Sequence, residues 1–398
     1  MHLDEKIIEA LKKVLKFQSQ NKVIPLHEPI FKSTNASKYV LECINDGMVS
    51  SIGKWGNIFE KKICEYTSAN NAVLVTNGTV ALRLALYLIG VRREDEVFIP
   101  SISFVATANA ISHLGAFPHF IDVSSQSLGM DPTSLEKRLQ EVSIIRHGKI
   151  FNKFTNRQIK AILPVHIFGN PADMFKLKNI AENWGIPIVE DSAEALGSWH
   201  KNNNSFVHCG LKGDIGILSF NGNKIITTGG GGALITNNDD LASKARHLST
   251  TAKVPHPWEF NHDEIGWNDR MPSLNAALGV SQIENLEYKL KQKKKLYEKY
   301  KLCFKDIEEI KLLSADEESI SNNWLISIEF LSKDNSYVKE ITEKLLKKTN
   351  DMGIHLRPLW KPLNKLKIYK NEQKGDLKNS DYYEKRIICL PSSPQIMN

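Results

Sequence analysis

The 398-residue chain is poor in cysteine, and the few cysteines that it has are widely separated. None of them belongs to a CxxC pair or has a histidine at a spacing that suits zinc. This arrangement argues against a disulfide framework and a zinc fold, so we expect a reduced, cytoplasmic protein without a metal site. The cysteines are Cys43, Cys64, Cys209, Cys303 and Cys389.

Long apolar runs are also missing. No stretch approaches the length of about 20 residues that a membrane-spanning helix needs. At the N-terminus, Leu3, Ile7 and Leu11 recur at helical spacing among charged residues. This pattern predicts an amphipathic helix and not a signal peptide, and we expect no membrane association.

A strong excess of one charge is absent as well. The chain has 52 lysines and arginines against 45 aspartates and glutamates, which gives a formal charge of +7. Such a small excess favours anionic small molecules and does not indicate nucleic-acid binding. The densest basic run, Lys289 to Lys301, keeps leucines and tyrosines among its lysines, so we expect it to form the solvated face of a long helix.

What the chain does have is a regular alternation of strand-like and helix-like segments. The strand-like segments are nearly continuous apolar runs, which indicates an α/β protein whose mainly parallel central sheet is covered by helices on both faces. We expect these strands at 72–75, 96–100, 117–123, 159–168, 186–191 and 215–220.

The division into domains follows from the length and from one long helical pattern. A chain of this size favours more than one domain, and a helix expected over 271–304 leads out of the first. The remainder contains a strand at 324–330, a helix at 338–350 and a strand at 354–358. We therefore expect an N-terminal helix and extended arm at 1–35, a large domain at 36–285 and a smaller C-terminal α/β domain at 286–398.

One lysine stands out because of its position. Lys224 lies between the apolar run 215–220 and a second strand-like segment, which begins at Ile225 and continues through four glycines, 229–232, to Thr236. A loop lysine at the edge of a sheet can act as an amine, although most such lysines are simply solvated. The rest of the chain must decide between these two interpretations.

The other polar residues of interest lie at the ends of the expected strands, where parallel sheets bind their ligands. Asp191 ends one strand, and Asn77-Gly78-Thr79 opens a helix directly after another, which presents free N–H groups to an anion. Ser219 precedes the lysine loop, and Phe104 offers a flat aromatic face. Pyridoxal phosphate requires a lysine, a carboxylate for the pyridine nitrogen and donors for its phosphate, so these residues predict a pyridoxal-phosphate site.

Several longer stretches carry a resemblance to a known family. The chain resembles the sugar aminotransferases of the DegT/DnrJ/EryC1/StrS family, which are fold-type I pyridoxal-phosphate enzymes, over nearly its whole length from Pro25 to Ser393. The matching stretches are NGTVAL from residue 77, PSISFVATANAI from 100, LPVHIFGNPADM from 163, VEDSAEALGS from 189, SFNGNKIITTGGGGALITN from 219 and IGWNDRMPSLNAALG from 265.

The resemblance implies a role for each matching residue. Lys224 corresponds to the Schiff-base lysine, and Asp191 to the partner of the pyridine nitrogen. Asn268 corresponds to an asparagine that reaches the phosphate from a neighbouring subunit, which implies a homodimer with a shared active site. The residues implied to bind the phosphate are Gly78, Thr79 and Ser219, and Phe104 is implied to stack on the ring. Glu194 corresponds to a residue near the 3-hydroxyl of the cofactor, although it could instead be a simple exposed glutamate.

Two further residues are expected to be structural. His166 could act as a general base because histidine titrates near neutrality, but the resemblance implies a scaffold role. Arg270 is expected to anchor a salt bridge. One departure is Asn364, which stands where the family often has a histidine after Pro-Leu.

Within the family the chain most resembles the branch of the legionaminic acid and bacillosamine pathways. That branch transfers an amino group from L-glutamate to C4 of a nucleotide-linked 4-keto-6-deoxy-N-acetylhexosamine. The implied product is UDP-4-amino-4,6-dideoxy-N-acetylglucosamine, although close relatives use GDP-linked sugars. Two alternatives are a sugar dehydratase of the same fold, whose branch has histidine in place of Lys224, and a non-catalytic cofactor-binding regulator.

Overall fold

The computed structural model describes residues 2–17, 23–203 and 205–397. Residues 18–22, within the extended arm expected at 1–35, lie outside the described residues. The central strands form two hydrogen-bonded groups, β3-β2-β6 and β7-β10-β11-β1. Parallel bridges from Ile162 to Ile188 and from Val165 to Asp191 join them side by side. The strands are β1 (Asn71–Val75), β2 (Glu96–Pro100), β3 (Phe117–Ile121), β6 (Ile159–Ile162), β7 (Val189–Asp191), β10 (Ile215–Ser219) and β11 (Gly232–Thr236).

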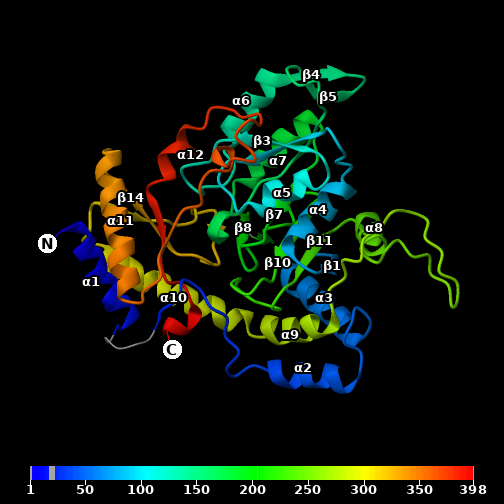
Figure 1. Ribbon diagram of the computed structural model, residues 1–398, viewed down its shortest axis with the longest axis horizontal. Helices are drawn as coiled ribbons and strands as arrows, with labels where there is room; N and C mark the ends of the chain where they lie inside the picture. Colours follow the sequence, from blue (N-terminus) through cyan, green and yellow to red (C-terminus); the bar gives the residue numbers. More distant parts are fainter. Residues whose placement is uncertain (1, 18–22, 204, 398) are drawn as a thin grey trace.

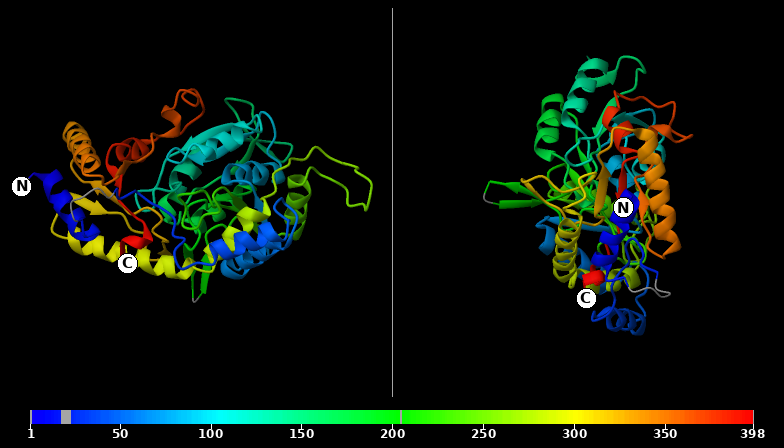
Figure 2. Two further views of the ribbon diagram at one scale, coloured as in Figure 1. Left: turned by 60° about the horizontal axis from the view of Figure 1, so that its bottom comes forward. Right: turned by 90° about the vertical axis from the view of Figure 1, so that its left-hand side faces the viewer.

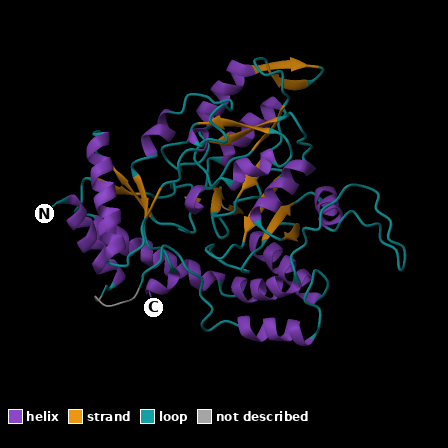
Figure 3. Ribbon diagram, in the orientation of Figure 1, coloured by secondary structure: helices purple, strands orange, loops and turns teal. Residues whose placement is uncertain are grey.

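Most neighbours in this sheet run parallel. β2 is parallel to both β3 and β6, and β10 is parallel to β7. β11 is antiparallel to β10 and to β1. The expected α/β class with a mainly parallel sheet is therefore confirmed, and the strands lie at the centre of the molecule with helices around them (Figure 3).

Helices cover both faces because successive strand residues point to opposite sides. Val73, Ile99 and Ile217 pack on the helices of one face, whereas Leu74 and Phe98 pack on those of the other. The first face is covered by α4 (Gly78–Leu88), α5 (Ala106–Ser112) and α8 (Asp239–Ser249). The second is covered by α3 (Lys54–Thr67), α6 (Pro132–Val142), α7 (Met174–Trp184) and α9 (Ser273–Ile283).

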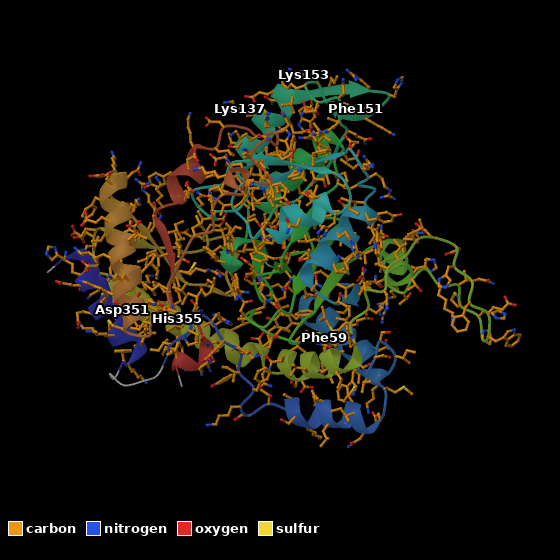
Figure 4. All side chains as sticks on the ribbon, viewed as in Figure 1. Phe59, Lys137, Phe151, Lys153, Asp351 and His355 are labelled. Carbon is orange, nitrogen blue, oxygen red and sulfur yellow. The ribbon has the colours of Figure 1, made fainter. Side chains whose placement is uncertain are left out.

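The contact between α3 and α9 is close. Phe59 of α3, labelled in Figure 4, is fully buried. A Cβ atom on Gly279 of α9 would lie 2.5 Å from the Phe59 ring, so only glycine fits there. α2 (Ala36–Asn45) lies below α9 at the edge of the molecule (Figure 1).

The C-terminal part has its own antiparallel sheet, in the order β12-β14-β16-β15. Leu11 of α1 packs into the same apolar cluster as Leu296 and Ile341, so the N-terminal helix covers this part of the molecule. The two helices α1 and α11 stand next to each other in Figures 1 and 2. The elements are α1 (Leu3–Leu15), α10 (Leu286–Phe304), α11 (Asn335–Asp351), α12 (Lys378–Tyr383), β12 (Ile310–Leu312), β14 (Ser327–Phe330), β15 (Arg357–Pro358) and β16 (Ile387–Cys389).

Short elements complete the fold. β4 and β5 form a hairpin, and β8 pairs with both β9 and β13. All five cysteines are free thiols. In the part of the chain that the structure describes, no helix combines the length and the apolar character needed to cross a membrane. The bounds are β4 (Ser143–Arg146), β5 (Lys149–Asn152), β8 (Trp199–Asn202), β9 (Ser205–His208) and β13 (Ser319–Ile320), with 3-10 turns at Ile167–Gly169, Leu363–Lys365 and Pro394–Met397.

Several local expectations were wrong, and the strand expected at 354–358 is reduced to Arg357–Pro358. The helix expected over 271–304 is two helices, α9 and α10, and the strand expected from Ile225 begins only at Gly232. The strand expected at 159–168 ends at Ile162, shortly before Pro164, which has no N–H to donate to a sheet. The basic run is not wholly solvated, because Lys289 and Lys293 are only 2% and 0% exposed.

Candidate active site

A cavity of about 300 Å³ lies beyond the carboxyl ends of β7 and β10, beside the start of α4. Seven of the eight residues predicted for the cofactor line it, and the eighth, Asn268, does not. The seven are Gly78, Thr79, Phe104, Asp191, Glu194, Ser219 and Lys224.

Lys224 is held inside this cavity. It lies in the turn that follows β10, where its backbone N–H donates to Asn221 O at 3.0 Å. Its Nζ atom donates to Glu194 Oε1 at 3.2 Å and lies 4.0 Å from the ring centre of Trp324. Because its side chain is only 11% exposed, the interpretation as a solvated loop lysine is wrong.

Glu194 is the acidic neighbour of this amine. It is 5% exposed, so the alternative of an exposed glutamate is also wrong. Its Oε2 atom accepts the backbone N–H of Phe168 at 2.8 Å, which fixes the carboxylate toward Lys224. Burial raises the pKa of the Glu194 carboxyl, and the nearby positive charge of Lys224 opposes that rise.

Asp191 sits at the end of β7 and is 4% exposed. Thr107 donates its hydroxyl to Asp191 Oδ2 at 2.8 Å, and Ser103 lies 2.7 Å from the same hydroxyl. Burial raises the pKa of the Asp191 carboxyl, and the hydrogen bond from Thr107 partly offsets this effect. A buried carboxylate to which no cationic side chain of the described residues is bonded is suited to a positively charged ring nitrogen.

The start of α4 and the end of β10 form a cradle for an anion. Asn77 caps the helix by accepting the Val80 N–H at 2.9 Å, which leaves the first N–H groups of the helix free for a ligand. A Cβ atom on Gly78 would lie only 3.0 Å from Ser219 Cβ. Glycine at this position therefore lets the start of α4 lie directly against the end of β10, which places the Ser219 hydroxyl beside the first N–H groups of the helix. Free N–H groups with a hydroxyl beside them fit the phosphate of the cofactor.

The four glycines of 229–232 do not form a nucleotide loop. A Cβ atom on Gly232 would lie 2.7 Å from the carbonyl carbon of Asn77, and one on Gly231 would lie 2.2 Å from Thr228 Oγ1. Gly232 therefore packs against the backbone of Asn77, which lines the cavity, and Gly231 packs against the Thr228 side chain, so neither position has room for a side chain.

Aromatic side chains form another part of the wall. Phe104 is 53% exposed, and its ring centre lies 6.3 Å from that of Trp360. Trp324 donates its indole N–H to Asn223 O at 2.7 Å, next to Lys224. Trp324, Trp360 and also Arg357 come from the C-terminal part of the chain, and no local sequence signal marked them as site residues.

Asn268 lies outside the cavity. It is exposed and forms a bridge with Thr250, at the base of a long loop that extends away from the body of the protein on the right of Figure 1. Its predicted contact with the phosphate of a neighbouring subunit stays a prediction. Asn364 is also absent from the cavity wall, and its side-chain oxygen accepts the hydroxyl of Ser101 at 3.0 Å.

His166 is part of the scaffold under the site. Its Nδ1 accepts the Ala172 N–H at 3.1 Å, so its Nε2 carries the proton and donates to Glu190 at 3.0 Å. Burial alone would raise the pKa of Glu190, but the bond from His166 and the loop N–H groups that it accepts lower that pKa to about 2. His200 and Cys209 lie near His166, all within 4.8 Å, yet both His166 nitrogens are already bonded. Arg270 lies 3.9 Å from Glu60, as expected of an anchor.

A buried lysine, a buried carboxylate and an anion cradle beyond the carboxyl ends of a mainly parallel sheet define a pyridoxal-phosphate enzyme. The chain matches the DegT/DnrJ/EryC1/StrS aminotransferase family over residues 32–398 and belongs to this family. Its cofactor is pyridoxal phosphate, and the predicted fold-type I class is confirmed.

Three comparisons illustrate the relationship. A GDP-perosamine synthase of Escherichia coli O157:H7 is 32% identical over 379 residues, which cover 95% of this chain and 95% of that protein. A UDP-4-amino-4,6-dideoxy-N-acetyl-beta-L-altrosamine transaminase of Campylobacter jejuni serotype O:23/36 is 30% identical over 342 residues, 85% of each chain. The crystal structure of a DegT/DnrJ/EryC1/StrS aminotransferase from Brucella abortus has a TM-score of 0.79 and 28% identity, covering 91% of this chain and 93% of that one.

Proposed function

We propose that the protein transfers an amino group from L-glutamate to C4 of a nucleotide-linked 4-keto-6-deoxy-N-acetylhexosamine in the cytoplasm. The favoured substrate is UDP-linked, with UDP-4-amino-4,6-dideoxy-N-acetylglucosamine as the product, for a surface glycan or a nonulosonic acid of the legionaminic type. The observation that carries the proposal is the buried amine of Lys224, 3.2 Å from Glu194 and in the same cavity as Asp191.

Each of the predicted cavity residues has its own role in the proposed reaction. Pyridoxal phosphate, when bound, supplies a carbonyl for amines and a ring that withdraws electrons. Asp191 holds the proton on the ring nitrogen, and Gly78, Thr79 and Ser219 hold the phosphate. Lys224 would hold the cofactor through its Nζ atom, and the same atom would be the base that moves a proton at the reacting carbon of the substrate. Glu194 positions the Lys224 amine.

A visible absorbance spectrum tests the lysine. The purified protein with cofactor should show a band above about 400 nm that shifts on addition of L-glutamate. Lys224→Ala should lose both the resting band and all transfer activity, because no other lysine among the described residues lines the cavity. Lys137→Ala is the matched control, since Lys137 lies on α6 with a side chain that is 67% exposed. A Lys224→Ala variant that keeps the band would reject the assignment.

A substrate comparison tests the sugar. UDP- and GDP-linked 4-keto-6-deoxy sugars, with and without the N-acetyl group, should be assayed for glutamate-dependent amination. We expect the UDP-linked N-acetylhexosamine to have the highest kcat/KM. The 32% identity to a GDP-perosamine synthase supports a GDP-linked 4-keto-6-deoxyhexose as the second candidate. Inactivity on every one of these sugars would reject both the UDP-linked and the GDP-linked substrate, but it would not affect the assignment of Lys224.

We also propose that the enzyme is a homodimer whose active sites are shared. Large apolar side chains are exposed on and just after α2, where Leu41 is 58% and Ile52 is 70% exposed. Others are exposed on the long loop after α8, where Trp258 is 75% and Ile265 is 84% exposed. Exposed apolar clusters of this kind support an interface with a second subunit.

A further inference from the structure

Trp324 contacts Lys224 and its turn through two different parts of its side chain. Its indole N–H donates to Asn223 O at 2.7 Å, in the residue that precedes Lys224. The centre of its ring lies 4.0 Å from Lys224 Nζ. Trp324 is buried, so water does not weaken either contact. It therefore holds both the backbone of the lysine turn and the amine at the end of the lysine side chain.

The position of Trp324 is fixed by two buried side chains. Asn322 accepts the backbone N–H of Trp324 on its Oδ1 atom at 2.8 Å. The Nζ atom of Lys293, on α10, donates to Trp324 O at 3.1 Å and also to Ser392 O. Both side chains are buried. The two polar groups of the Trp324 backbone are thus bonded in the protein interior, so the ring is in place before the cofactor binds.

Asn322 also connects Trp324 to the other neighbour of the lysine amine. Its side-chain amide donates to Glu194 O at 2.8 Å. The backbone of Gly169 approaches so closely that an added Cβ atom would overlap Asn322 Oδ1, and φ there is +87°, so this position requires glycine. Glu194 and Trp324, which both contact the Lys224 amine, are therefore tied to each other through one amide.

An aromatic face suits an amine that must move. A second carboxylate would bind the Lys224 ammonium group through directed hydrogen bonds. The face of an indole ring attracts a cation without such bonds, so Nζ can turn while it stays near the ring. The hydrogen bond from Trp324 to Asn223 meanwhile holds the turn itself. Trp324 thus sets how far Lys224 reaches into the cavity and leaves the direction of its amine free.

We propose that Trp324 is a positioning residue, which places the Lys224 amine at the aldehyde carbon of pyridoxal phosphate. The inference rests on the proposed role of Lys224. The amine condenses with the aldehyde, one water molecule leaves, and a C=N bond forms between Nζ and that carbon. The rate of this step depends on the alignment of the two reacting atoms. A misplaced amine should therefore slow bond formation even where the phosphate cradle is unchanged.

The test compares two forms of the cofactor that differ at the reacting group. Pyridoxamine 5′-phosphate has an amine in place of the aldehyde, so it binds in the cavity without a bond to Lys224. Trp324→Phe keeps a ring but loses the indole N–H. When pyridoxal phosphate is added to the cofactor-free variant, we expect the visible band to grow about 5- to 10-fold more slowly than in the wild type. The band should grow more slowly still in Trp324→Leu, which has no ring. The Kd for pyridoxamine 5′-phosphate, measured by calorimetry, should stay unchanged in Trp324→Phe.

Two controls separate positioning from a general loss of structure. Trp184→Phe also removes an indole hydrogen bond, which Trp184 of α7 donates to Glu136 Oε2 at 3.2 Å outside the cavity, and it should change neither measurement. In the Lys224→Ala background, Trp324→Phe should leave the Kd for pyridoxal phosphate unchanged, because the amine that Trp324 positions is gone.

Three results would overturn the inference. They are an unchanged rate of band formation in Trp324→Phe, an equal loss of affinity for both forms of the cofactor, and a loss that persists in the Lys224→Ala background. The last two would mean that Trp324 shapes the cofactor pocket and does not act through Lys224. Failure of the proposed role of Lys224 would look different, because the wild-type protein would then form no visible band at all.

Discussion

At the scale of single residues, the cofactor cradle depends on a missing side chain. Gly78 lies so close to Ser219 that an added Cβ atom would stand 3.0 Å from Ser219 Cβ and 3.1 Å from its hydroxyl oxygen. These contacts are tighter than almost all that real side chains make, so either the serine or the start of α4 would have to move. The residues that would move are those that bind the phosphate.

Gly78→Ala should therefore weaken cofactor binding while the protein stays folded. We expect the Kd for pyridoxal phosphate to rise by about tenfold or more, which corresponds to roughly 1.4 kcal/mol. The Kd is measured by titrating cofactor-free protein and following absorbance. Gly222→Ala is the control, because a Cβ atom there would meet nothing within 4 Å. Equal affinity in both variants would contradict the cradle.

The sequence predicted seven residues of this cavity, all from the large domain, and missed those from the C-terminal part of the chain. Asp191 and Ser219 end apolar strands, and parallel strands bring such ends together, so their meeting follows from the pattern. Arg357 and Trp324 are ordinary residues in their own segments. They reach the cavity only through the packing of two sheets, which no local pattern describes.

At the scale of elements, two helices with the same cap differ in what they face. Asn77 caps α4 by accepting the Val80 N–H at 2.9 Å, and Asn238 caps α8 by accepting the Leu241 N–H at 3.0 Å. Asn77 lines the cavity, whereas Asn238 does not. Substitution of each asparagine in turn can therefore separate an effect on helix stability from an effect on cofactor binding.

Asn77→Ala and Asn238→Ala should destabilise the protein by similar amounts. Loss of such a cap costs about 1 kcal/mol, measured as a shift in urea unfolding of the cofactor-free protein. Only Asn77→Ala should also raise the Kd for pyridoxal phosphate, because the start of α4 holds the phosphate. If Asn238→Ala raised the Kd for pyridoxal phosphate as much as Asn77→Ala, the effect would come from the general loss of stability, and α4 would have no special role in binding the cofactor.

Element boundaries were less predictable than element types. The apolar spacing over 271–304 is helical throughout, yet the chain turns at Glu284 and Asn285, between α9 and α10. α9 packs on Phe59 beneath the large sheet, whereas Leu296 of α10 packs into the C-terminal cluster. A helix that must serve two separate cores bends between them, and single-helix periodicity cannot show that. The helical spacing also cannot show that Lys289 is buried. Burial removes water from its ammonium group and lowers its pKa to about 7.

At the scale of the whole molecule, one predicted site residue lies outside the cavity of its own chain. Asn268 is exposed near the base of the long loop that follows α8. That loop and α2 carry the exposed apolar residues that support a second subunit. If the proposed dimer is correct, Lys224 and Asn268 of one chain serve two different active sites.

This arrangement predicts complementation between two inactive variants. Lys224→Ala should be inactive, and Asn268→Ala should have a strongly raised Kd for pyridoxal phosphate and little activity at limiting cofactor. When the two are mixed in equal amounts and allowed to exchange subunits, half of the dimers are mixed. Each mixed dimer has one site with both changes and one site with neither, so about a quarter of the wild-type activity should return. Sedimentation of the mixture should show dimers throughout. No recovery after proven exchange would mean that both residues act within one chain, or that Asn268 does not reach the phosphate.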